Sequence, residues 1–160
     1  MLHTNRSFWI GMLTLLVLLG GCKKSSKNNP ANKWMKQLKS GEAAKRKEAA
    51  EALGRLGPKA KPAIPTLANV LKNDDDNEVR YAAATALGRT KLANAPVAMR
   101  ALTLALKSSD ADMRLAAVKA IGNMGIAGLP AAAILRTMER DQDEDDRVKA
   151  AIKVTLSRLR

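Results

Sequence analysis

Histidine and cysteine, the side chains most often used as general bases, nucleophiles and transition-metal ligands, each occur once in this sequence. His3 is the only histidine and Cys22 the only cysteine among 160 residues. A single cysteine excludes an internal disulfide and any metal site built from several thiolates. Beyond position 22 the chain has neither an imidazole nor a thiol, which excludes the catalytic classes that depend on them in that region.

Carboxylates are the other candidate metal ligands, and they gather in short acidic runs. The longest run, residues 141–146, has carboxylates at its first, third and fifth positions, as the start of an EF-hand calcium loop does. Asp146 and Ile152 replace the glycine and the bidentate glutamate that such a loop needs at positions six and twelve. We interpret this run, and residues 74–76, as helix-capping loops, with a Ca²⁺ site as the alternative. We predict no metal and no cofactor.

A basic residue follows each of three acidic stretches at a matching place: Arg80, Arg114 and Lys149. Stacked structural units would place these side chains in a row beside the row of carboxylates. The pattern therefore predicts a ladder of ion pairs and helix caps between units. The alternative is an anion-binding site on the same ridge.

The N-terminal segment has the features of a secretory signal. Residues 8–19 form an apolar run of 12 residues, shorter than the roughly 20 that span a membrane and typical of a secretory signal. The letters LGGC follow at residues 19–22 and resemble the lipobox of bacterial lipoprotein signal peptides. This resemblance implies that residues 1–21 are removed and that Cys22 becomes an acylated N-terminus bearing palmitate-type chains. A buried free cysteine and an uncleaved anchor are the alternatives.

The lipoprotein resemblance also implies a location. A lipid-anchored chain would lie at the bacterial cell envelope, on the extracytoplasmic side of a membrane, with inner and outer membrane both open. Residues 22–33 are polar, lack helical periodicity and contain a proline, so we predict a lipidated cysteine followed by a flexible basic tether.

The basic charge is concentrated beside the predicted anchor. The formal net charge of +13 would by itself suggest nucleic acid or an anionic membrane as a partner. Residues 22–47 contain nine basic residues and one acid, whereas residues 48–160 are closer to balanced. We therefore predict a membrane-facing basic segment, with each lysine contributing about 1 kcal/mol near anionic lipid. Its membrane-proximal members are Lys23, Lys24, Lys27, Lys33, Lys36 and Lys39.

The remainder of the chain repeats itself. Gly54, Gly88 and Gly122 each close a stretch of small and apolar residues, and they are spaced 34 residues apart. A fourth copy ends in Ser157, 35 residues after the last glycine. Apolar residues recur at helical spacing in every copy, and each glycine marks a helix end or a close helix crossing. A proline opens a second helical pattern in each unit, at Pro62, Pro96 and Pro130.

The repeated unit resembles a HEAT repeat, of the short type first recognised in phycobilisome lyases. Its acidic turn, Val-Arg pair, alanines and Ala-Leu-Gly segment are matched at residues 78–88, and residues 112–122 match with Met and Ile substitutions. Lys45-Arg46 in the first copy lacks the valine and the preceding acid. The resemblance implies an all-α fold, a short α-solenoid of about four HEAT-like helical hairpins over residues 34–160, with a half-repeat at each end.

The resemblance also implies partner binding on the concave face, which the second helices of such stacks line. The polar candidates on that face are Asn69, Arg100, Thr103, Arg136 and Thr137. The leading hypothesis is a membrane-anchored, non-catalytic scaffold that binds an unidentified protein. The alternatives are an enzyme related to chromophore lyases and a basic HEAT-like nucleic-acid binder. The missing histidine and thiol argue against the first, and the export signal argues against the second.

Overall fold

The computed structural model describes residues 29–91 and 96–159, and all regular secondary structure in these ranges is helical. The α-helices are α1 (Ala31–Gln37), α2 (Ala43–Leu56), α3 (Ile64–Asn73), α4 (Asn77–Arg89), α5 (Pro96–Ala105), α6 (Ala111–Asn123), α7 (Ala132–Arg140) and α8 (Asp146–Arg158). Two 3-10 segments, η2 (Gly57–Ala63) and η3 (Gly125–Ala131), precede α3 and α7. The predicted all-α solenoid is confirmed.

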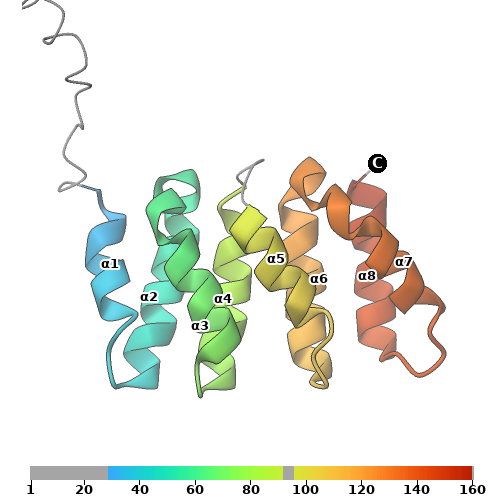
Figure 1. The fold of residues 1–160 in the computed structure, drawn as a ribbon, viewed down its shortest axis with the longest axis horizontal. Helices are drawn as coiled ribbons and strands as arrows, with labels where there is room; N and C mark the ends of the chain where they lie inside the picture. The colour runs from blue at the N-terminus through green and yellow to red at the C-terminus, as the bar shows by residue number, and fades with distance from the viewer. Residues whose placement is uncertain (1–28, 92–95, 160) are drawn as a thin grey trace, which may run out of the picture.

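The helices stack in two layers (Figure 1). Helices α2, α4, α6 and α8 form a first layer in which each packs on the next, and α3, α5 and α7 lie across them as a second layer. Neighbours along the chain also pack as hairpins, α1 with α2, α3 with α4, α5 with α6 and α7 with α8. The chain therefore forms the four stacked hairpins that its repeats predict, each read as second helix followed by first helix.

Three first-layer helices begin at an aspartate that caps them. The backbone N–H of Val79 donates to Asp76 at 3.0 Å, that of Asp112 to Asp110 at 2.9 Å and that of Arg147 to Asp145 at 2.8 Å. These bonds satisfy backbone donors that the first helical turn leaves without a partner. The acidic runs thus act as helix caps, as the sequence predicts.

The repeated glycines lie where first-layer helices cross. A Cβ atom built on Gly88 would lie 2.6 Å from both the Cα and the carbonyl oxygen of Ala120 on the next helix. At Gly54 the nearest atom would be the Cα of Ala86 at 3.1 Å, and at Gly122 it would be the Thr155 hydroxyl at 2.8 Å. Of the two interpretations, the close crossing is therefore confirmed, since the helices themselves continue for one or two residues beyond these positions.

The core lies between the layers and is built from small and aliphatic side chains. Its largest fully buried members are Leu53, Leu67, Leu87, Leu102, Ile121, Leu135, Ile152, Val79, Val118, Val148 and Thr90. Alanines fill most of the remaining core positions. This composition lets helices approach closely, which agrees with the near absence of aromatic residues from the sequence.

The element boundaries differ from the sequence prediction at two kinds of place. Helix α1 begins at Ala31, which is fully buried, so the folded domain starts three residues before the boundary predicted at residue 34. Pro62 and Pro130 lie inside the 3-10 segments, whereas Pro96 begins α5 as predicted. Both 3-10 segments bury small residues, Ala60 and Ala63 in η2 and Gly128 and Ala131 in η3, so apolar spacing could not separate these segments from the helices that follow.

The N-terminal predictions fall outside this structure. The apolar run, the lipobox with Cys22, and Lys23, Lys24 and Lys27 lie outside the described residues. Among the helices that are described, none combines the length and the apolar character needed to cross a membrane.

The close crossing at Gly88 makes a direct prediction about stability. Replacing Gly88 with alanine forces the backbones of α4 and α6 apart, so we expect the free energy of unfolding to fall by about 1–3 kcal/mol, measured by urea denaturation. Gly41→Ala is the matched control, because a Cβ at Gly41 meets nothing within 4 Å. Equal stability of the two variants would contradict the proposed crossing.

Candidate functional site

Of the ion pairs that connect successive repeats in the described ranges, two are poorly exposed. Arg46 donates from Nε and Nη2 to the two carboxylate oxygens of Asp74, both at 2.8 Å. Arg114 also uses Nε and Nη2 on Glu144: Nη2 donates to Oε1 at 2.7 Å, and Nε donates to Oε1 at 3.0 Å and to Oε2 at 3.1 Å. The arginine side chains are 16% and 17% exposed and both acids are 6% exposed. Paired, poorly hydrated groups of this kind bond more strongly than exposed ion pairs.

The arginines occupy equivalent positions in their repeats. Nη1 of each donates to the backbone carbonyl six residues earlier: Arg46 to Ser40, Arg80 to Asp74 and Arg114 to Ser108, at 2.8–3.0 Å. The helix start thus orients every guanidinium toward the turn that precedes the next first-layer helix. The predicted ladder of ion pairs is therefore present only in part: Arg114 forms its pair, whereas Arg80 and Lys149 form none with any described residue. Arg46, which the departure of the first copy from the repeat pattern had concealed, forms the other pair.

The ladder is interrupted at its middle step. The position equivalent to Asp74, 34 residues later, is Ser108. Its hydroxyl accepts the backbone N–H of Asp110 at 3.2 Å, just as Asp74 accepts that of Asp76 at 3.0 Å. Serine thus maintains the turn but supplies no charge to Arg80.

The acids beside Arg80 have other partners. Asp110 accepts a 2.5 Å hydrogen bond from the hydroxyl of Tyr81. This bond raises the pKa of Tyr81 to about 12 and lowers the pKa of Asp110. The hydrogen bond from Arg46 similarly lowers the pKa of Asp74. Lys149, the last basic residue of the predicted row, donates to the carbonyl of Gln142 instead of to a carboxylate.

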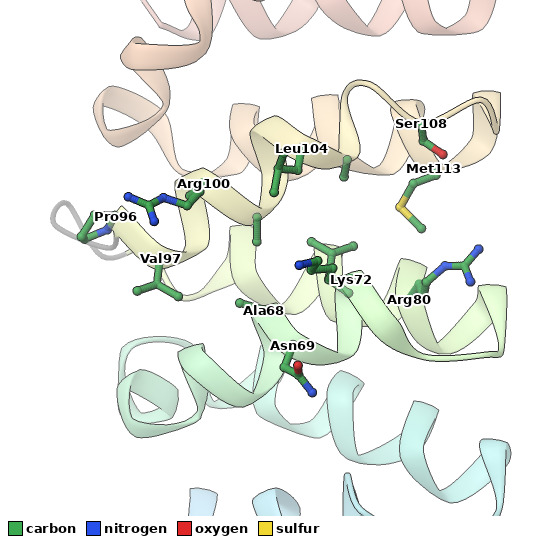
Figure 2. Close-up of a pocket in the computed structure, with 13 residues that line it drawn as sticks. Ala68, Asn69, Lys72, Arg80, Pro96, Val97, Arg100, Leu104, Ser108 and Met113 are labelled. Carbon is green, nitrogen blue, oxygen red and sulfur yellow. The ribbon is translucent and has the colours of Figure 1, made fainter.

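A groove lies between α3 and α5, with Arg80 at one end (Figure 2). Its volume is about 650 Å³. Apolar side chains line most of it, among them Ala68, Leu71, Val97, Ala101, Leu104 and Met113. Val97 and Leu104 are 48% and 54% exposed, which is high for residues of their size. The groove is therefore an apolar surface that no described part of the chain covers.

Three cations border this groove. Arg100 lies at the end marked by Pro96, Arg80 lies near Ser108 and Met113 at the other end, and Lys72 lies between them (Figure 2). All fifteen acidic residues of the chain fall within the described ranges. The ion pairs that they form do not include any of these three cations.

The structure separates the five residues predicted to contact a partner. Asn69 and Arg100 both line the groove. Thr103 is partly buried on α5 and does not line it. Arg136 and Thr137 are exposed on α7, away from the groove, and the Thr137 hydroxyl donates to the carbonyl of Ala133 at 3.2 Å.

Sequence reasoning did not identify Val97, Leu104, Lys72 or Ser108 as groove residues. Aligning the repeats at their acidic turns would have revealed Ser108 where the neighbouring copies have an acid. No comparable feature of the sequence predicts that Val97 and Leu104 are exposed, because both fit an apolar helical pattern.

The predicted basic segment is only partly described. Lys33, Lys36 and Lys39 are exposed on or just after α1. The Lys33 ammonium lies 4.7 Å from the centre of the Trp34 ring, within the range of a cation–π contact.

Three carboxylates of the 141–146 run have structural roles. Glu144 pairs with Arg114, Asp145 caps α8, and Asp141 accepts the backbone N–H of Asp143 at 3.0 Å. Within the described ranges, no group of three or more histidine, cysteine, aspartate or glutamate residues is arranged to hold a metal ion.

Comparison with known proteins identifies the repeat. A family model described as HEAT repeats matches residues 31–103 and residues 64–157. No curated protein matches the chain. The fold is similar to the crystal structure of an engineered protein, with a TM-score of 0.60 and 22% sequence identity. The match covers 82% of this chain and 62% of the engineered protein, and at this identity it shows the fold alone.

The interrupted ladder predicts a stabilising substitution. Ser108→Asp supplies the carboxylate that Arg80 lacks, so we expect the free energy of unfolding in urea to rise by about 1 kcal/mol. Ser108→Asn has the size and shape of aspartate without its charge and is the matched control, because Ser109 occupies the position at which Glu144 pairs with Arg114 in the next repeat. A rise of equal size in both variants would contradict a specific ion pair with Arg80.

The paired acids predict a loss of stability in acid. Asp74 has a folded-state pKa below its unfolded value of about 3.9. Its contribution to stability is therefore complete above pH of about 4 and is lost as the pH falls through the folded pKa. We expect the unfolding free energy to decline below pH of about 4, and Asp74→Asn to decline less steeply. Asp75→Asn, at an exposed neighbour outside the ladder, should retain the wild-type decline. An unchanged slope in Asp74→Asn would contradict this role.

Proposed function

The chain belongs to the HEAT-repeat family, and from this premise we propose that it is a membrane-anchored scaffold that binds another protein at the bacterial cell envelope. Repeats of this family commonly mediate protein–protein interaction. The observation that carries the proposal is the open apolar groove between α3 and α5, bordered by cations without acidic partners. Exposed apolar surface with a polar rim is the usual mark of an interaction site.

The anchor is proposed from the sequence. The 12-residue apolar run, the small residues before Cys22 and the lysines after it together support acylation of that cysteine and attachment to the extracytoplasmic side of a membrane. The exposure of Lys33, Lys36 and Lys39 near the start of the folded domain supports a basic surface facing anionic lipid.

A binding role without catalysis agrees with the residues of the repeat domain. Residues 29–159 contain no histidine and no cysteine. Trp34 and Tyr81 are the only aromatic residues after Cys22, and both pack against the core. Stacking of nucleic-acid bases or of a chromophore would favour several exposed rings. The groove favours a protein partner over these alternatives.

The anchor is tested by fractionation and mass spectrometry. We expect the wild-type chain in the membrane fraction, with an intact mass that shows Cys22 as an acylated N-terminus. Cys22→Ser should lose both the added mass and the membrane association. A wild-type protein that retains residues 1–21 without acyl chains would contradict the lipoprotein proposal.

Partner binding is tested by placing a photo-crosslinking amino acid in the groove of the lipidated chain in living cells. A crosslinker at Leu104 should give a discrete adduct with another protein. The same crosslinker at Val154, which is 51% exposed on α8 in the other layer, is the matched control and should not give that adduct. Absence of any adduct at Leu104 would count against the scaffold function.

A further inference from the structure

We propose that the groove between α3 and α5 binds an acidic peptide segment of the partner protein, and that a carboxylate of this segment binds Arg80 as Asp74 binds Arg46. This site belongs to the proposed protein-binding function and rests on it. The lining of the groove indicates a partner segment with acidic side chains separated by apolar ones.

Hydrogen bonds at the start of α4 hold the Arg80 side chain in place. Its Nη1 donates to the carbonyl of Asp74 at 2.9 Å and its Nη2 donates to Asn77. The helix start therefore holds Nη1 as it holds that of Arg46 and Arg114, each of which binds a carboxylate through Nε and Nη2. In Arg80 one of the two Nη2 hydrogens is used by Asn77, and Nε with the other Nη2 hydrogen is left for a carboxylate. An arginine oriented in advance loses little side-chain entropy when a carboxylate arrives.

The acids that interact with Arg80 inside the chain have other hydrogen-bonding partners. Asp74 is paired with Arg46, and Asp110 accepts the hydroxyl of Tyr81. Ser108, which takes the place of the paired acid in this repeat, lines the groove. A carboxylate from outside the chain can therefore approach Arg80 from the groove without displacing an existing ion pair.

Cationic side chains lie at both ends of the groove. Arg100 lies at the opposite end of the groove from Arg80 (Figure 2). Arg100 and Ser108 are eight residues apart on and just after α5, a distance of roughly 12 Å at the helical rise. About four residues of extended peptide cover that distance. The groove thus fits two acidic side chains with apolar side chains between them, resting on Val97 and Leu104.

The N-terminal segment of this chain does not fit this description. Residues 1–28 contain no aspartate and no glutamate, and their lysines and arginine have the same sign of charge as the groove. A fatty acid or a lipid headgroup carries its charge at one end only, whereas the groove has cations at both ends. A peptide with two acids is therefore the occupant that the arrangement favours.

The test measures binding of labelled peptides by fluorescence polarisation. The protein is the chain as cells produce it, held in nanodiscs of neutral phosphatidylcholine. The probes are capped peptides of leucine and alanine with two glutamates separated by about two to seven residues, together with the same peptides carrying glutamine. We expect saturable binding for at least one glutamate spacing and at least tenfold weaker binding of its glutamine counterpart.

Two variants locate the carboxylate. Ser108→Asp places an internal carboxylate against Arg80, so it should weaken peptide binding about tenfold or more while the protein remains folded. Ser108→Asn, which has the same size and shape without the charge, should bind within about twofold of wild type. Circular dichroism and urea denaturation of both variants verify the fold.

Several results would overturn the inference. Failure of every glutamate peptide to bind, equal binding of glutamine peptides, or equal weakening by Ser108→Asp and Ser108→Asn would each do so. Decanoate and phosphatidylglycerol vesicles are tested in the same way. If they bind and Ser108→Asp weakens their binding, while no peptide binds, the groove is a lipid site and the inference is wrong. A crosslinked partner at Leu104 that persists unchanged in Ser108→Asp would leave the scaffold function intact and contradict this site alone.

Discussion

The close crossing of first-layer helices is the constraint on which the rest of the structure depends. Helix α4 approaches α6 so closely at Gly88 that no Cβ atom fits against Ala120. Similar contacts at Gly54 and Gly122 repeat this approach along the stack. Because the helices meet through small residues, each turn before a first-layer helix lies within reach of the arginine of the preceding repeat. The ion pairs of the ladder follow from that spacing.

The ion pairs made by equivalent arginines along the stack have one exception. Arg46 and Arg114 each bind a carboxylate supplied by the next repeat, whereas Arg80 forms no ion pair with a described residue and Ser108 occupies the position equivalent to Asp74. Ser108 preserves the hydrogen bond of the turn, so the fold tolerates the loss of the acid. The guanidinium of Arg80, which forms no ion pair within the described ranges, lies at one end of the apolar groove between α3 and α5. One substitution in a structural ladder thereby places a charged group where a partner can use it.

The repeating features could be predicted from the sequence, and the local exceptions could not. The 34-residue period, the helical spacing and the capping acids point to one fold, because every copy supports the same interpretation. The start of α1 at Ala31 was missed because three helical residues in a polar segment carry no periodicity. The repeat pattern predicts an ion pair for Arg80, because its copy follows the pattern closely. It predicts none for Arg46, because the first copy departs from the pattern. The groove depends on how α3 and α5 are spaced, which one repeat viewed alone does not show.

The most direct test of this view is an NMR measurement on the arginine side chains. The Nε–Hε signals of Arg46, Arg80 and Arg114 are recorded while a glutamate peptide that binds is added. We expect the signal of Arg80 to move toward the positions of the other two, which already bind carboxylates, while those two remain in place. A signal of Arg80 that stays still as the peptide saturates, with changes confined to other parts of the protein, would contradict the role assigned to it.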